Sequence, residues 1–576
     1  MRFLSVKPIA ATLMAGLMLS ACGGGGGSSN SSASLGGPTG GGTPAPAPAA
    51  TKFYTDLETR EEAARFLIQA GFGGTDAEID SLVGTDAANW MTAQMRAPVT
   101  KTYDAMLAAY PTRQDTDREH SKMLWTNLLT ADDVLRQRMM FALSQIFVIS
   151  DNDFFDEGYT TAHYTDILTD HAFGNYREMI EDITYSPAMG QYLTYYRNRK
   201  GDERSGRMPD ENYARELLQL FSIGLVELNQ DGTPKAGSPE TYDNDDIIGL
   251  AKVFTGLSGS GPSFRWSDQD EDWRRKPLQM FDDEHSPLEK TFLGTTIPAD
   301  TTGVNSIDMA LDTIADHPNV APFLSRQMIQ RFTSSSPSPE YVRRVADAFD
   351  AGSFTAPNGR VFGSGQKGDF AAMIAAILLD ESVHDDVQEA NEGKLREPIV
   401  KFAHYARAFD LADIDVSAEW RFNDTSNPND KLGQHPLRSP SVFNFYRPGY
   451  LSPATESGEA GLTAPEFQIV NEGSMLGFSN FMTHYITVRA DDPAGNPGFN
   501  PDFAAEIALA NDPQALIDHL DVKLTAGQLS DATKAEMADT VSTLLIAADD
   551  AETDRLDRVQ LALIMMMSSG AFAVQN

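Results

Sequence analysis

The run Met208–Gly224 holds the residue types that acid–base chemistry needs, at helical spacing. Glu211 and Arg215 are four residues apart, as are Asn212 and Glu216, so each pair lies on adjacent turns of a helix. A guanidinium beside carboxylates can set a carboxyl pKa for proton transfer, or bind an anion. Glu211 and Glu216 are therefore candidate catalytic residues. Asn212 and Arg215 are candidate binding residues.

The same run can instead form a buried structural network. Arg215 would then bridge carboxylates and loop carbonyls. Ion-pair networks of this kind also shift pKa values, so spacing alone does not separate the two interpretations.

Two histidines could complete a site at this run. His285 follows three acidic residues at 282–284, where it could bind a metal or transfer a proton, or instead fix the loop through hydrogen bonds. His317 precedes Pro318 at an expected helix start, where it could cap the helix. We take His285 as a candidate catalytic residue and His317 as a candidate binding residue.

Several common catalytic motifs are absent from the sequence. There is no H-E-x-x-H zinc helix, no G-x-x-x-x-G-K-[ST] phosphate loop and no G-x-S-x-G nucleophile elbow. Because these motifs are absent, we predict no metal site, and the sequence identifies no cofactor.

Composition narrows the classes of partner. The chain has 45 Lys plus Arg and 82 Asp plus Glu, a net charge of −37, and a pI near 4.5. Binding a nucleic-acid backbone needs clustered cations, so we expect no nucleic-acid partner. The single Cys excludes an intrachain disulfide and a zinc site made of several cysteines.

The first 21 residues have the pattern of a secretory signal peptide. Arg2 and Lys7 precede the apolar run Pro8–Leu19, which is too short for an ordinary membrane-spanning helix. The segment Leu19–Cys22 resembles a bacterial lipobox, which implies cleavage before Cys22 and lipidation of that residue. We therefore expect a membrane partner reached through a lipid anchor on Cys22.

Gly23 and the residues that follow it indicate where in the cell the protein is located. Gly23, rather than Asp, favours the outer membrane under the usual sorting pattern of Gram-negative lipoproteins. Residues 22–50 are rich in Gly, Ser, Pro and Ala and predict a disordered, flexible linker. The expected location is the cell envelope, facing either the periplasm or the cell surface.

From residue 51 the sequence predicts a large, mainly α-helical globular body with long polar loops. Apolar residues recur at helical spacing, and convincing alternating strand patterns are few. We expect a main helical domain over 51–500, and a C-terminal helical portion over 501–576 that is part of the same body or a subdomain. The run Ala131–Ser150 predicts one long amphipathic helix. The segment Thr463–Glu466 predicts a capping box that starts a helix over Pro465–Thr487.

The run Met208–Gly224 also resembles the signature helix of a bacterial family called domain of unknown function 1800. Other stretches resemble the family in the same order: Ala64–Gly73, Leu135–Ser150, Ala172–Arg177, Ser186–Gly190, Asp245–Leu257, His285, Lys290–Gly294, His317-Pro318, Lys394–Pro398, Gly433-Gln434 and Pro440–Val442. The resemblance covers residues 56–576 and departs at Asn444–Tyr446, where a common version of the family has Gly-Trp. It implies an exported, mainly helical protein, often encoded beside a secreted phosphatase- or sulfatase-like protein. It implies no particular reaction.

Two functional hypotheses follow. The first is a tethered helical scaffold or binding protein that acts with a secreted partner at the cell envelope. The second is an envelope hydrolase or metal-dependent enzyme with a polar cleft. In the second, Glu211 or Glu216 would be the base and Arg215 the anion anchor, while His285 or His317 would be the acid or a ligand.

Geometry separates the two hypotheses. Lys290, from one of the matching stretches, is a further candidate binding residue. Convergence of Lys290 and His285 on the same open pocket as Glu211 and Arg215 would favour the enzyme. Buried, paired and separated side chains would favour the scaffold.

Overall fold

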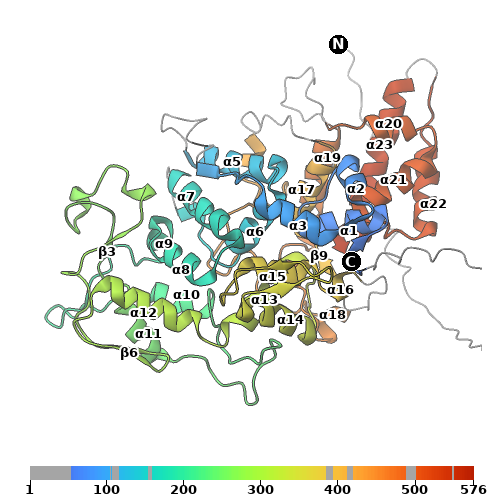
Figure 1. The fold of residues 1–576 in the computed structure, drawn as a ribbon. Coiled ribbons are helices and arrows are strands. Elements are labelled where there is room, and N and C mark those ends of the chain that lie inside the picture. Colours follow the sequence, from blue (N-terminus) through green and yellow to red (C-terminus); the bar gives the residue numbers. More distant parts are fainter. Residues whose placement is uncertain are drawn as a thin grey trace, which may run out of the picture. The chain divides into compact units, whose positions relative to one another are not determined.

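A computed structural model of the chain describes residues 53–103, 106, 116–153, 158–384, 393–410, 420–487, 501–547 and 551–576. The predicted signal peptide, Cys22 and the linker lie outside the described residues. Residues 52–576 cluster into one compact unit. Its architecture is mainly α-helical, as predicted, with short antiparallel strand pairs between the helices (Figure 1).

Helices account for most of the regular structure, and their order follows the chain from blue to red in Figure 1. In the first half they are α1 (Arg60–Ala70), α2 (Asp76–Leu82), α3 (Ala87–Arg96), α5 (Thr116–Thr130), α6 (Val134–Ser144), α7 (Gly158–Asp170), α8 (Tyr176–Thr184), α9 (Pro187–Tyr192), α10 (Asn212–Gln219) and α11 (Asn244–Ala251). In the second half they are α12 (Gly303–Ala315), α13 (Val320–Phe332), α14 (Pro339–Ala351), α15 (Phe370–Leu378), α16 (Glu381–His384), α17 (Pro398–Ala408), α18 (Glu456–Glu459), α19 (Glu472–Thr487), α20 (Ala504–Leu509), α21 (Pro513–Thr525), α22 (Asp531–Ser542), α23 (Ala551–Met567) and α24 (Gly570–Ala573).

The strands form two-stranded antiparallel sheets. The pairs are β1 (Asp56–Leu57) with β2 (Thr85–Asp86), β3 (Leu257–Ser258) with β4 (Gln279–Met280), β5 (Lys290–Phe292) with β6 (Thr295–Ile297), β7 (Phe354–Thr355) with β8 (Val361–Phe362), and β9 (Lys394–Leu395) with β10 (Val574–Gln575). Each strand has two or three residues, so these sheets join loops and do not form a core layer.

Local sequence signals set the ends of α14. The Ser338 side chain accepts a hydrogen bond from the Tyr341 amide, and Pro339 opens the first turn. The helix ends at Gly352, whose φ of 62° is left-handed. A Cβ at Gly352 would lie 2.0 Å from the Gln366 carbonyl oxygen, so the chain requires glycine there.

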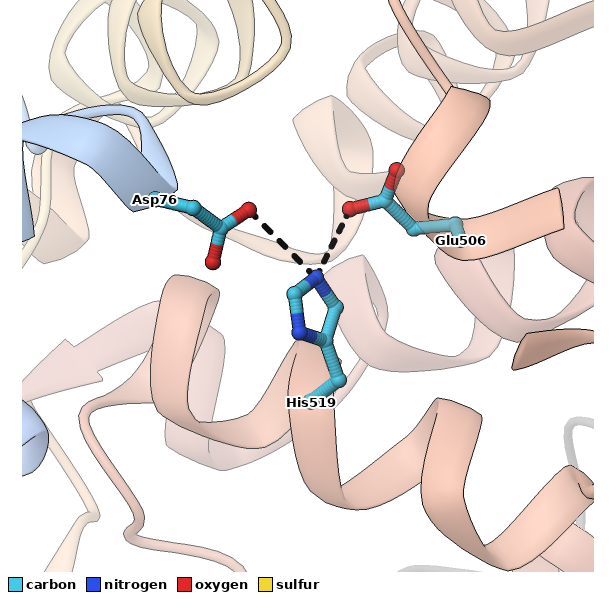
Figure 2. A group of neighbouring side chains, drawn as sticks. All are labelled: Asp76, Glu506 and His519. Atoms are coloured by element: carbon cyan, nitrogen blue, oxygen red, sulfur yellow. Dashed lines mark hydrogen bonds and ion pairs between the residues drawn. The ribbon is translucent and has the colours of Figure 1, made fainter. Parts of the chain in front are cut away.

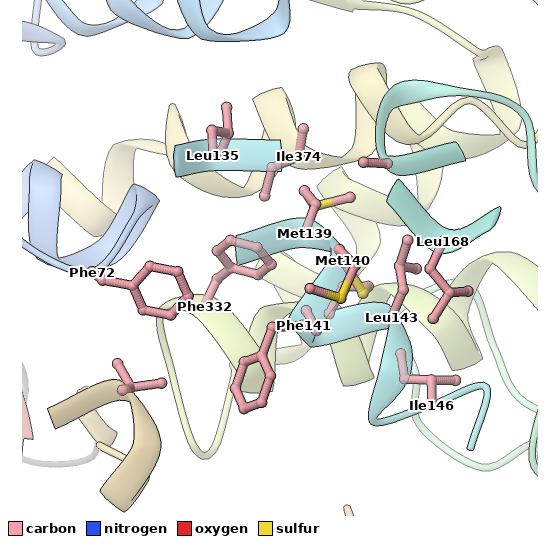
Figure 3. Close-up of a cluster of buried hydrophobic side chains, with 14 of the residues drawn as sticks. Phe72, Leu135, Met139, Met140, Phe141, Leu143, Ile146, Leu168, Phe332 and Ile374 are labelled. Carbon is pink, nitrogen blue, oxygen red and sulfur yellow. The ribbon is translucent and has the colours of Figure 1, made fainter. Parts of the chain in front are cut away.

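The centre of the core is α6, which is buried on every side (Figure 3). Its apolar residues contact Phe72, Phe332 and Ile374 from segments distant in the sequence. The prediction of an amphipathic helix over 131–150 is therefore wrong in both extent and character. Arg136 tolerates burial because its guanidinium donates to the carbonyl of Thr169 at 3.2 Å.

The predicted helix over 465–487 is broken. A short 3-10 turn covers Pro465–Gln468, and α19 begins only at Glu472. The capping box does not form, because its two side chains are used elsewhere. Thr463 donates to the Ser335 carbonyl at 2.8 Å, and the Glu466 carboxylate lies 2.5 Å from the Lys394 ammonium.

The two ends of the described unit pack together. α1 and α2, in blue, lie beside α21, in red (Figure 1), and α1 contacts α21 directly. In addition, β10 pairs with β9 in the middle of the chain. Among the described residues, no helix combines the length and apolar character needed to cross a bilayer.

Candidate functional site

The signature run forms α10, which is shorter than predicted. The helix begins at Asn212, whose amide donates to the Asp210 carboxylate at 2.9 Å, and it ends at Gln219. Tyr213 and Leu217 are buried and anchor one face of the helix in the core. The opposite face carries the polar candidates.

Glu211 and Arg215 form the ion pair that their spacing predicts. The Arg215 guanidinium lies 3.2 Å from the Glu211 carboxylate, and the two side chains are 42% and 35% exposed. Asn212 lies beside them, and its amide donates to the Thr194 hydroxyl at 3.4 Å. The pair therefore sits at the surface and is not part of a buried network.

Glu216 is in a different environment from Glu211, although both belong to the same run. The residue is only 8% exposed, and within the described structure its Oε2 has no hydrogen-bond partner. Burial raises the pKa of the Glu216 carboxyl, and the nearby charge of Arg215 offsets only part of the effect. Glu216 is thus the candidate with the acid–base tuning that a catalytic carboxyl requires.

His285 fixes a loop. Its Nδ1 lies 2.8 Å from the Thr255 carbonyl oxygen. We therefore assign the ring proton to Nδ1, which donates a hydrogen bond to that oxygen. Its Nε2 then accepts from the Ser306 hydroxyl at 3.3 Å. Burial lowers the pKa of His285, which keeps the ring neutral.

Lys290 and His317 also have structural partners. Lys290 is fully buried and donates to the Leu288 carbonyl at 3.2 Å, and burial lowers its pKa. The Nδ1 of His317 accepts from the Asn319 amide at 3.2 Å, immediately before α13. Burial likewise lowers the pKa of His317.

Among the described residues, no hydrogen bond or ion pair joins the α10 candidates to His285 or Lys290. His285 and Lys290 lie close enough to each other for their charges to interact. A surface hollow of about 290 Å³ lies elsewhere, between the start of α8 and the end of α12. Two of its charged groups, Arg177 and Asp312, already pair with each other at 2.7 Å.

A second group of ionisable side chains was missed by the sequence analysis. Asp76, Glu506 and His519 place ligand-type atoms within 4.8 Å of one another (Figure 2). The Nε2 of His519 lies 2.9 Å from Glu506 and 3.5 Å from Asp76. The residues come from opposite ends of the chain, so no local pattern could have predicted the group.

Lys523 completes this group, which we call the Asp76 cluster (Asp76, Glu506, His519 and Lys523). Its ammonium lies 2.8 Å from the Asp76 carboxylate and 3.0 Å from the Glu506 carboxylate. Two carboxylates and an imidazole suit a divalent cation. Here the ammonium already supplies the positive charge, so a metal would have to displace it.

The pKa values within the Asp76 cluster follow from this pairing. Burial alone would raise the pKa of both carboxyls. Hydrogen bonds from Lys523 to Asp76 and from His519 to Glu506, with the charge of Lys523, outweigh burial, and both pKa values are lowered. The cluster therefore acts as an ion-paired clamp between α2 and the helices α20 and α21.

Comparison with known proteins gives one match. A family model described as "Protein of unknown function (DUF1800)" matches residues 65–574. This match confirms the resemblance carried by the signature run and its companion stretches. No curated protein and no solved structure matches the chain.

Proposed function

We propose that this chain, which belongs to the DUF1800 family of proteins of unknown function, is a tethered scaffold or binding protein of the cell envelope. A lipid on Cys22 and the linker over 22–50 would hold the helical body to the outer membrane. α10 would present its polar face to a secreted partner.

The exposed face of α10 supports this proposal. The Glu211–Arg215 pair is half exposed, and the large apolar side chains of Met208 and Leu225 beside the helix are 66% and 57% exposed. These polar and apolar side chains are accessible to a partner, and protein interfaces combine both kinds of group. His285, by contrast, is buried and holds a loop.

The nature of the partner comes from the family resemblance. Members of this family are often encoded beside a secreted phosphatase- or sulfatase-like protein. A protein of that kind is our first candidate partner.

Site-specific crosslinking in native membranes tests the proposal. A photo-crosslinking residue at Met208 should capture a secreted protein in stoichiometric yield. The same residue at Val361, which is 62% exposed on β8, should not. Arg215→Glu should reduce the yield at Met208 severalfold. Equal capture from both positions, or none from Met208, would contradict the proposal.

An envelope hydrolase is the second candidate function, and only Glu216 favours it. Its burial, raised pKa and unpartnered oxygen fit a general acid. If this is correct, purified protein should hydrolyse envelope material, Glu216→Gln should abolish the activity, and Glu211→Gln should retain most of it. Activity that survives Glu216→Gln would eliminate this role.

A further inference from the structure

The loop between β3 and β4 contributes Trp266 and Trp273 to an ordered stack of aromatic rings with Tyr196. Tyr196 and Trp273 are parallel, with ring centroids 4.7 Å apart and an interplanar angle of 8°. Trp266 meets Trp273 edge-on at 5.9 Å. Trp273 is buried, whereas Trp266 is 52% exposed. One indole thus supports another that faces solvent.

The surrounding loop holds this stack in place. The Tyr196 hydroxyl donates to Gln269 at 2.8 Å, and Gln269 donates to the Ser258 hydroxyl at 2.9 Å. Gly259 is required, because a Cβ there would lie 2.6 Å from the Trp273 ring. The exposed indole is therefore preorganised, which lowers the entropy cost of binding a ligand.

Arginines lie near the exposed Trp266 ring and near the ring of Phe264, two residues before it. The Arg274 guanidinium lies 5.3 Å from the Trp266 centroid, and the Arg197 guanidinium lies 5.7 Å from that of Phe264. Arg197 and Arg265 are exposed, and neither takes part in an ion pair in the described structure.

Most acidic neighbours of this surface have partners of their own. Glu284 lies 2.6 Å from Arg199, and Asp272 lies 2.8 Å from Lys276. Asp268 accepts from Ser263 at 2.6 Å. Salt at about 0.15 M screens charges beyond about 8 Å, so more distant carboxylates contribute little to the local field.

We propose that Arg197, Phe264, Arg265 and Trp266 form a binding site for an acidic polysaccharide. The exposed indole face would pack on the C–H face of a sugar ring, as apolar surface does against any aromatic ring. The guanidiniums would bind the carboxylate or sulfate groups of the chain, for which their planar geometry is suited.

The number of exposed aromatic rings and unpaired arginines favours a glycan over a nucleic acid. A nucleic-acid strand needs a series of stacking rings and a track of cations. A single exposed indole with two unpaired guanidiniums matches one or two sugar residues. This site uses none of the α10 candidate residues, so its test is independent of the test of the proposed function.

Calorimetry on the purified chain with its linker tests the site. The probe is an oligogalacturonate of defined length. Its comparators are the fully methyl-esterified form, a polyglutamate of equal charge and an oligo(dT). We expect saturable binding of the oligogalacturonate. Each of the three comparators should bind at least about tenfold more weakly.

Three variants locate the binding. Trp266→Ala should weaken it about tenfold, the scale of one lost aromatic stacking contact. Arg265→Gln should weaken it severalfold and flatten its salt dependence. Leu288→Ala, at another exposed apolar side chain, should have no effect. Circular dichroism and urea unfolding check that each variant is folded.

Each alternative result overturns part or all of the proposal. Absence of oligogalacturonate binding overturns the site. Equal binding of polyglutamate or oligo(dT) shows that charge alone acts, and equal binding of the ester removes the role of the arginines. Unchanged binding by Trp266→Ala places the ligand elsewhere.

Discussion

The α10 face and the Asp76 cluster both place two carboxylates beside a cation, but in opposite surroundings. On α10 the cation is the guanidinium of Arg215, and its ion pair with Glu211 is half exposed. In the Asp76 cluster, Lys523 and Glu506 are almost fully buried. A surface pair contributes little to stability, whereas a buried pair is costly to break. The comparison shows that similar residues can form a surface available for recognition in one place and a structural clamp in another.

The largest effect should come from Lys523→Met. This change leaves the buried Glu506 carboxylate without its ammonium partner, so the free energy of unfolding should fall by about 3–5 kcal/mol. Urea unfolding followed by circular dichroism measures it. Lys276→Met breaks an exposed ion pair and should cause a much smaller loss of stability. Equal losses for the two variants would show that the Asp76 cluster is not a clamp.

The next effect is the acid dependence of the Asp76 cluster. The pKa values of Asp76 and Glu506 are lowered in the fold, so both carboxylates stabilise it when ionised. That stability is complete above the unfolded carboxyl pKa of about 4 and is lost as the pH falls through the lower folded values.

Urea midpoints measured between pH 2 and 7 check this acid dependence. Wild type should lose more stability than Glu506→Gln over the acidic part of the range. Parallel profiles for the two proteins would contradict the assigned direction.

A smaller effect of opposite sign should follow from Glu216→Gln. Burial raises the pKa of Glu216, so the stability linked to its protonated form is present at low pH and is lost as the pH rises. Neutralising the residue should therefore stabilise the fold at pH 7. The gain should vanish near pH 4, and Glu211→Gln should give no comparable gain. A loss of stability at pH 7 would mean that the carboxylate has a partner when ionised.

The smallest effect should come from the Glu211–Arg215 pair itself. A double-mutant cycle with Glu211→Gln and Arg215→Gln should give a coupling free energy of about 0.3–0.5 kcal/mol. High salt should remove it, because the pair is exposed. A coupling above about 1 kcal/mol would mean that the pair supports the fold.

Helix positions were the most predictable part of the fold, because their signals are local. Ser338, Pro339 and Gly352 bound α14, and all three signals lie within or next to the helix in the sequence. The complete burial of α6 was not predictable from local signals. Its burial on every side depends on Phe332 and other residues distant in sequence, which hydrophobic periodicity does not report. The helix break before Glu472 likewise follows from a long-range partner, Lys394.

The candidate sites also differ in whether contacts local in the sequence or distant contacts determine them. The spacing of Glu211 and Arg215 predicted their ion pair correctly, because neighbouring helical turns are fixed by helix geometry. It could not predict that Glu216 is buried while Glu211 is exposed. The Asp76 cluster was missed because His519 meets Asp76 only after the ends of the chain pack together. The roles assigned to the α10 residues and to His285 in catalysis or binding stay predictions.

The pairing of β9 with β10 constrains the order in which the chain can fold. The Arg396 guanidinium donates to the carbonyl of Phe572, 176 residues further along the sequence, and Gln575 donates to the Phe332 carbonyl. Such distant contacts carry a large loop-closure cost and form late. During vectorial synthesis, Arg396 therefore lacks this acceptor until the ribosome has passed residue 572. The pairing of β9 with β10 must therefore be among the last contacts to become possible as the chain is made.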